Sequence, residues 1–100
     1  MKIHQINDDS GQLHAFEVGN SLLGRKGVLK IVRNIPGVIV SEEPKLFSRT
    51  QREEFCRFQL DGQEFVVEEP FGDNSRYLIS AVPPGPCPQF ELVEKTFAKA

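Results

Sequence analysis

Apolar and polar residues alternate most regularly around Asp61-Gly62, in the segment EFCRFQLDGQEFVVEE. Asp-Gly is a preferred dipeptide of the type I′ β-turn, because both central residues of that turn adopt positive φ. If the strands leave this turn in the register that a two-residue loop imposes, Phe58 faces Phe65 and one side of the hairpin is apolar. The segment therefore predicts a tight β-hairpin whose two phenylalanines lie in the core.

The opposite side of this hairpin is predicted to be polar, with Arg57 diagonal to Glu64 and Glu68. Adjacent apolar residues nevertheless occur at positions 66–67 and 77–79, and neighbouring residues of a strand point to opposite sides of the sheet. Val66 and Leu78 are therefore expected to face away from the core. We predict both as interface residues, because an exposed apolar patch usually marks a contact surface.

Two segments have the period of an amphipathic helix. In residues 21–34, one arc is apolar and the opposite side is basic, a cap is available at Asn20 or Ser21, and Pro36 follows the end. The apolar arc contains Gly24, Val28, Ile31, Val32 and Ile35, and the basic side contains Lys26, Lys30 and Arg33. A second helix is predicted over 89–100, with Phe90, Val93 and Phe97 in one stripe and Pro88 at its first position.

The remaining strands are predicted at 2–7, 12–18, 37–41 and 76–82, whereas the segment 42–54 has no clear pattern. The strand at 37–41 is expected to be buried. Two registers are open for the first hairpin. Asn7 opposite Gln12 places Ile3 opposite Phe16, and a slip by one residue places His4, Ile6, His14 and Phe16 on a common face.

The order β-β-α-β-β-β-β-α predicts a single α+β domain over residues 1–100. We expect an antiparallel-dominated sheet with both helices packed on one face, in a two-layer sandwich. A chain of 100 residues has nothing left to cover the other face of such a sheet. That face is then either solvated or buried against another molecule, and a homodimer is the arrangement we favour.

Charge and composition narrow the function classes. The formal net charge of −2 argues against nucleic-acid binding, which usually requires a basic excess. The N-terminus has no apolar signal segment, no stretch is long enough to span a membrane, and two cysteines make no disulfide framework. We expect a cytoplasmic protein that binds no membrane, no metal and no cofactor.

The segment FGDNSRY, residues 71–77, is the candidate ligand site. Gly, Asp, Asn and Ser are the residues that a strand-to-strand turn requires, so a turn explains most of the segment. Arg76 has the forked guanidinium that binds carboxylates or phosphates. A ligand site would combine Arg76 with Asp73, Asn74, Tyr77 and, as an acid–base group, His14.

The chain contains no phosphate-binding glycine loop, nucleophile elbow or Cys/His pair in a catalytic context. The leading hypothesis is a small non-enzymatic protein-interaction module of an accessory, regulatory or immunity type, which binds a protein partner or itself. The alternative is a small enzyme or ligand-binding protein that acts on an anionic substrate through Arg76 and Asp73. A weaker alternative is nucleic-acid binding through the basic helix at 21–34.

Overall fold

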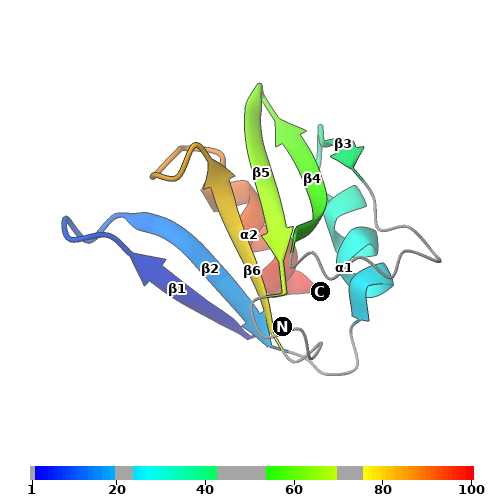
Figure 1. Cartoon of the computed structure of the whole chain (residues 1–100), viewed down its shortest axis with the longest axis horizontal. Coiled ribbons are helices and arrows are strands. Elements are labelled where there is room, and N and C mark those ends of the chain that lie inside the picture. The colour runs from blue at the N-terminus through cyan, green and yellow to red at the C-terminus, as the bar shows by residue number, and fades with distance from the viewer. Residues whose placement is uncertain (1, 20–23, 43–53, 70–75) are drawn as a thin grey trace.

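Residues 2–19, 24–42, 54–69 and 76–100 are described by a computed structural model of the chain (Figure 1). Within them the strands and helices follow the predicted order. They are β1 (Ile3–Asn7), β2 (Leu13–Gly19), α1 (Gly24–Arg33), β3 (Ile39–Glu42), β4 (Glu54–Leu60), β5 (Gln63–Glu68), β6 (Arg76–Val82) and α2 (Phe90–Lys99). The α+β prediction is confirmed.

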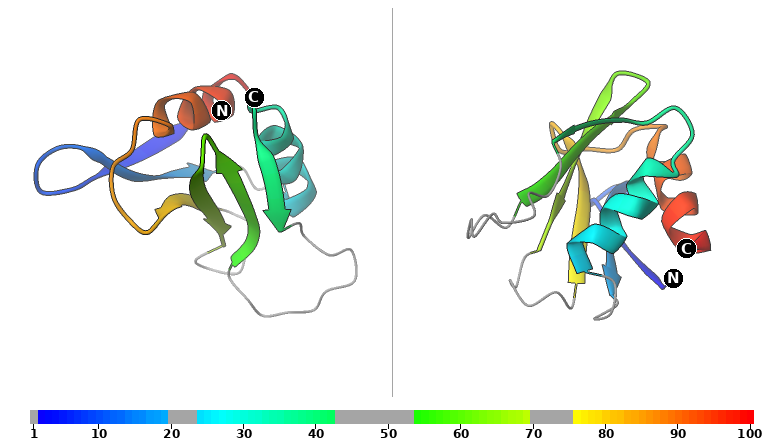
Figure 2. Two further views of the ribbon diagram at one scale, coloured as in Figure 1. Left: turned by 90° about the horizontal axis from the view of Figure 1, so that it is seen from above. Right: turned by 90° about the vertical axis from the view of Figure 1, so that its right-hand side faces the viewer.

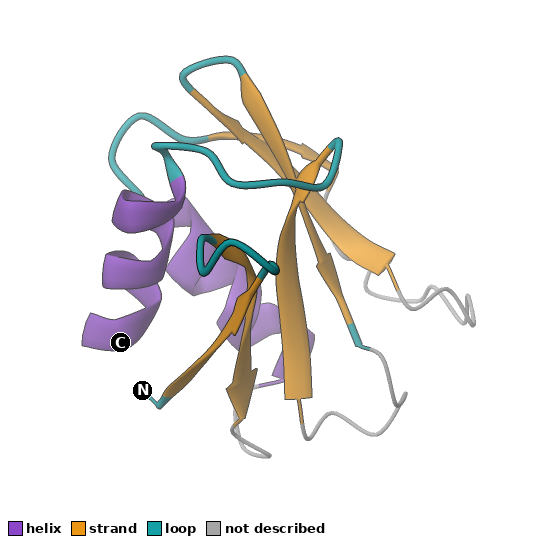
Figure 3. Cartoon of the chain, turned by 90° about the vertical axis from the view of Figure 1, so that its left-hand side faces the viewer, coloured by secondary structure: helices purple, strands orange, loops and turns teal. Residues whose placement is uncertain are grey.

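The strands form a six-stranded sheet in the order β1-β2-β6-β5-β4-β3, and every pairing is antiparallel. After the first hairpin the chain passes through α1 to the opposite edge of the sheet. A meander from β3 to β6 then returns to the middle, where β6 pairs with β2. Figure 2 shows both helices on the same side of the sheet, and Figure 3 shows the two layers from the side of β1.

Aromatic side chains connect the two layers. Phe65 stacks on Phe58 at a centroid distance of 5.2 Å, and Phe90 of α2 meets Phe65 edge-on at the same distance. Phe16 of β2 packs edge-on against Phe90 and Phe97 of α2. Edge-on and offset aromatic pairs stabilise a core beyond the area that they bury. These rings thus fix α2 over the centre of the sheet.

The β4–β5 hairpin has the predicted register, with Phe58 opposite Phe65. Asp61 and Gly62 have φ values of 51° and 77°, as the type I′ turn requires. No neighbouring heavy atom lies within 4 Å of where a Cβ of Gly62 would be, so only the backbone conformation requires glycine there.

Replacing Gly62 with valine should therefore reduce the free energy of unfolding by more than about 1 kcal/mol, because a β-branched residue resists positive φ. Urea denaturation followed by circular dichroism measures this loss. Gly62→Asn is the matched control, because asparagine tolerates the left-handed region and should cost less. Equal stability of the valine variant and the wild-type protein would contradict the turn assignment.

The first hairpin has neither predicted register. Ile3 pairs with Val18 rather than with Phe16, and Asn7 pairs with Leu13 across a β-bulge in which His14 is the extra residue. The side of Ile3, Phe16 and Val18 was nevertheless predicted correctly, because a shift of two residues does not change which side chains share a face.

The turn of this hairpin explains the shift. Asp8 Oδ1 accepts hydrogen bonds from the Ser10 hydroxyl at 2.6 Å and from the backbone N–H groups of Ser10 and Gln12. The Ser10 hydroxyl and the Gln12 amide together hold the pKa of Asp8 below its usual range. The backbone N–H of Asp8 also donates to the Gln12 carbonyl, which closes a longer loop than a two-residue turn.

The amphipathic division of α1 is confirmed, since Val28, Ile31 and Val32 are buried and Lys26 and Lys30 are exposed. The described helix begins at Gly24, whose φ of +67° is left-handed, and the predicted cap residues at 20 and 21 lie outside the described residues. In α2 the predicted apolar stripe of Phe90, Val93 and Phe97 is buried. The helix begins at Phe90, whereas Pro88 was predicted as its first residue.

The strand at 37–41 was expected to be buried, and this prediction is wrong. β3 is the edge of the sheet, and the Ile39 side chain is 65% exposed. A short run of β-branched residues in the sequence does not distinguish an edge strand from a central strand.

In the described part of the chain, no helix is long and apolar enough to cross a membrane.

Candidate functional site: the helix-free sheet face

The side of the sheet opposite the helices, here called the helix-free face, is defined by the strand registers. Its middle row crosses the sheet through Arg57, Val66, Ser80, Ala15 and Ile6. A second row consists of Glu54, Glu68, Leu78, Glu17 and His4, and a third of Ile39, Gln59, Glu64 and Val82. No described helix packs on this face (Figures 2 and 3).

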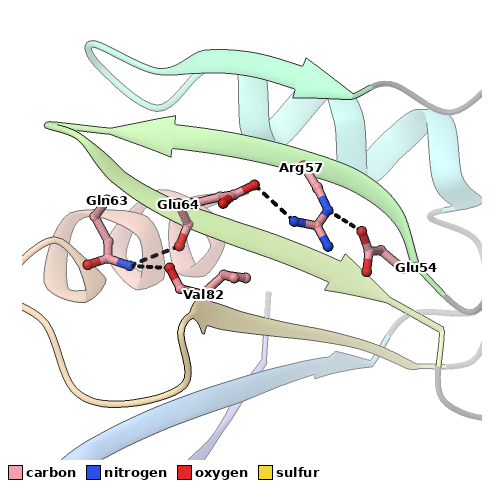
Figure 4. A network of polar contacts seen from close by, with 5 residues as sticks. All are labelled: Glu54, Arg57, Gln63, Glu64 and Val82. Atoms are coloured by element: carbon pink, nitrogen blue, oxygen red, sulfur yellow. Dashed lines mark hydrogen bonds and ion pairs between the residues drawn. The ribbon is translucent and has the colours of Figure 1, made fainter.

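Arg57 organises the polar part of the face (Figure 4). Its Nε donates to Glu54 of the same strand, and its Nη1 donates to Glu64 Oε1 on β5 at 2.9 Å. The hydrogen bonds from Glu54 and then Glu64 raise the pKa of Arg57. About a third of each of the three side chains is exposed. The pairing of Arg57 with Glu64 was predicted, whereas Glu54 reaches Arg57 because a bulge shifts its position in β4.

Gln63 adds a second bridge at the turn end of the same strands. Its Nε2 donates to the backbone carbonyls of Glu64 at 3.0 Å and Val82 at 3.2 Å, and so connects β5 with β6. Exposed ion pairs contribute only about 0–1 kcal/mol each to stability. The effect of this network is therefore mainly to hold charged groups in fixed positions on the face.

The apolar residues of the face are unevenly covered. Val66 lies on the predicted side, but its side chain is only 5% exposed within the single chain, and Leu78 is half-buried. Val66 is thus a poor contact residue. Among the described residues, the exposed large apolar ones are Ile6 at 37% and Ile39 at 65%, one on each edge strand.

Acidic groups predominate among the described side chains of the face. In its described part, the face carries two arginines, Arg57 and Arg76, and four glutamates, which are Glu17, Glu54, Glu64 and Glu68. Arg76 Nη1 lies 3.7 Å from Glu17 Oε2, and both groups remain partly in contact with solvent. The described part of this face therefore carries a net negative charge beside exposed apolar side chains.

The predicted ligand residues are not brought together where they are described. Arg76 is exposed on the helix-free face, whereas its neighbour Tyr77 is completely buried on the helix side. His14 lies near the opposite end of β2 from Gly19, which pairs with Arg76. Asp73 and Asn74 lie outside the described residues.

The histidines and the basic residues of α1 were the other candidates for chemistry. No group of three or more His, Cys, Asp or Glu side chains there is arranged to hold a metal ion. His4 is exposed on the helix-free face, where it pairs with Glu17. His14 is the extra residue of the β-bulge, so the two histidines do not lie opposite each other in the first hairpin. Lys26 and Lys30 of α1 are exposed, and none of the ring contacts of the described residues involves either of them.

A groove that the sequence did not predict lies between the first hairpin and the start of α2. It has a volume of about 550 Å³ and is lined in part by Leu13, Cys87 and Phe90, with Glu94 at its rim. Gln5 Nε2 lies 2.9 Å from both carboxylate oxygens of Glu94. Because the two residues are 89 positions apart, no local sequence pattern indicates that they meet.

Cys87 should be the only thiol that reacts in the native protein, because Cys56 is completely buried. Burial raises the pKa of the Cys87 thiol, and a raised pKa keeps the thiol protonated over a wider pH range. Iodoacetamide should therefore modify Cys87 more slowly than free cysteine at neutral pH, and the rate should still rise with pH above about 8.5, where that of free cysteine levels off. Mass spectrometry after timed quenching measures this rate, and Cys87→Ser is the control. Modification of two thiols without denaturant would contradict the prediction.

Comparison with family models, with curated proteins and with solved structures gave no match to this chain.

Proposed function

We propose that the protein is a non-enzymatic interaction module that binds a partner protein on its helix-free face. The observation that carries the proposal is the composition of this face. Fixed charges around Arg57 lie beside the exposed Ile39 and the half-buried Leu78, and both described helices pack on the other side of the sheet. Interfaces commonly combine apolar contacts with a polar rim.

The charge of the face indicates the chemistry of the partner. Four glutamates against two arginines favour a partner surface that is basic and apolar, because complementary charges increase the rate and selectivity of association. A second copy of the chain would bring two acidic faces together. Like charges oppose that arrangement, so a different protein is favoured over the homodimer that the sequence suggested.

The test is affinity capture with purified protein, followed by binding measurements on each retained protein. Ile39→Lys combined with Leu78→Thr changes the helix-free face, and Ala98→Lys introduces the same charge on the exposed surface of α2. Circular dichroism establishes that all variants are folded. We expect a basic partner whose affinity falls by at least about tenfold with the face variant, a loss of about 1.4 kcal/mol. We expect unchanged affinity with Ala98→Lys.

Two results would refute the proposal. One is a set of partners whose affinity is the same for the face variant and the wild-type protein. The other is a dimer in sedimentation velocity that the face variant dissociates, because the face would then bind a second copy. A monomer at micromolar concentration is the expected result.

A further inference from the structure

The two helices enclose a groove on the side of the molecule opposite the helix-free face. It has a volume of about 380 Å³ and lies between the end of α1 and the last turns of α2. α1 and the turn after it contribute Ile31, Asn34 and Pro36, and α2 contributes residues spaced as one helical stripe, among them Leu92, Lys95 and Lys99. Figure 1 shows the two helices on one side of the sheet.

The floor of the groove is apolar and its rim is basic. Ile31 is 7% exposed and Leu92 is half-buried, whereas Lys95 and Lys99 are exposed. Among the described residues, neither lysine has a carboxylate within ion-pair distance. Lys30 lies one helical turn before Asn34 and continues the basic rim along α1.

Helix stability accounts for only part of this charge distribution. In α2, Glu91 in the first turn and Lys99 in the last turn are favourable to the helix dipole. In α1, Lys30 and Arg33 in the last turn are likewise favourable to the helix dipole, and Arg25 in the first turn pairs with Glu69. The helix dipole does not account for Lys95, which precedes the last turn of α2, so the position of Lys95 beside Lys99 at the groove suggests a ligand of opposite charge.

We propose that this groove binds an acidic amphipathic segment of a partner protein. Apolar side chains of the segment would contact Ile31 and Leu92, and its carboxylates would meet Lys95 and Lys99. Amphipathic segments bind grooves between helices in this way, with apolar anchors at a spacing of three or four residues. An apolar floor without aromatic rings gives nucleic-acid bases nothing to stack on.

The inference goes beyond the proposed function, because the groove and the helix-free face lie on opposite sides of the sheet. Either surface can fail its test while the other passes. Replacing Ile39 on the helix-free face with lysine should leave the affinity of the groove for its ligand unchanged, and this variant separates the two proposals.

The experiment is selection of peptides from a displayed random library on the immobilised full chain. We expect enriched peptides in which Asp or Glu follows Leu, Ile or Phe at three or four positions. Titration calorimetry with a synthetic copy of an enriched peptide should show an affinity loss of at least about tenfold for Lys95→Gln with Lys99→Gln. Lys95→Arg with Lys99→Arg should retain binding, and Lys26→Gln, which removes one lysine charge outside the groove, should have no effect.

The affinity should also fall as salt is raised, because exposed charges are screened. The proposal is overturned if no acidic peptides are enriched, or if Lys26→Gln reduces binding as much as the groove variant does. Binding of single-stranded DNA or of phosphatidylserine vesicles that depends on Lys95 and Lys99 would also overturn it, because the groove would then serve a different class of ligand.

Discussion

Replacing Phe65 with alanine should lower the free energy of unfolding by about 3–5 kcal/mol, the loss typical of a fully buried phenylalanine. Phe65 is 0% exposed and occupies the centre of the core, with Phe58 stacked on one side and Phe90 edge-on at another. Its strand partner on β6 is Ala81, which is too small to fill the space that the ring would leave. The cavity would therefore persist.

Urea denaturation monitored by circular dichroism gives the free energy for each variant. Phe65→Leu keeps most of the volume and should cost clearly less than the alanine variant, about 1–2 kcal/mol. Gln59→Ala on the exposed side of the neighbouring strand should change stability by no more than about 0.5 kcal/mol. A Phe65→Ala variant within about 1 kcal/mol of the wild-type protein would mean that this ring is not central to the core. Since domains are stable by about 5–15 kcal/mol, the expected loss is a large fraction of the total.

The sequence predicted this part of the fold because its determinants are local. The turn chemistry of Asp61-Gly62 and the alternation on both sides of it agree, and each specifies Phe58 opposite Phe65. Local agreement between turn and pattern leaves one register. In the first hairpin the hydrogen bonds of Asp8 determine the loop length, and an alternating pattern cannot distinguish registers that differ by two residues.

The candidate site was less predictable, because its members meet only in the folded chain. The sequence alone does indicate that Arg76 and Tyr77 cannot belong to one site. They are adjacent in a strand, so their side chains lie on opposite sides of the sheet. The Gln5–Glu94 contact and the pairing of Arg25 with Glu69 join segments 89 and 44 residues apart. Neither the periodicity nor the composition of the chain indicates which distant residues meet.

The contact between Arg25 and Glu69 is the most deeply buried ion pair among the described residues. The Arg25 Nε donates to Glu69 Oε1, and the guanidinium lies 4.7 Å from the centroid of the Phe55 ring. The Glu69 side chain is 3% exposed, while that of Arg25 is 30% exposed. The pair joins the first turn of α1 to the residue that follows β5. Stacking of a guanidinium on an aromatic ring adds to its attraction for the carboxylate.

Replacing Arg25 with methionine should cost about 1–3 kcal/mol, because Glu69 would remain buried without this partner. The value lies below the 3–5 kcal/mol typical of fully buried pairs, since solvent reaches Arg25 and screens the interaction. Methionine keeps most of the contact with Phe55, so the loss reports mainly the missing charge. Chemical denaturation at moderate salt measures it. Lys26→Met, at the exposed neighbouring position, is the matched control and should have little effect.

Replacing Arg25 with methionine and Glu69 with leucine together should be less damaging than the sum of the two single changes. The double variant no longer contains the buried Glu69 carboxylate, and an apolar pair of similar size often replaces a buried ion pair at little cost. A double-mutant cycle built from the four free energies isolates this interaction, because residues in direct contact are expected to be non-additive. Additive single effects would show that the two side chains contribute independently and that the ion pair does not couple α1 to the end of β5.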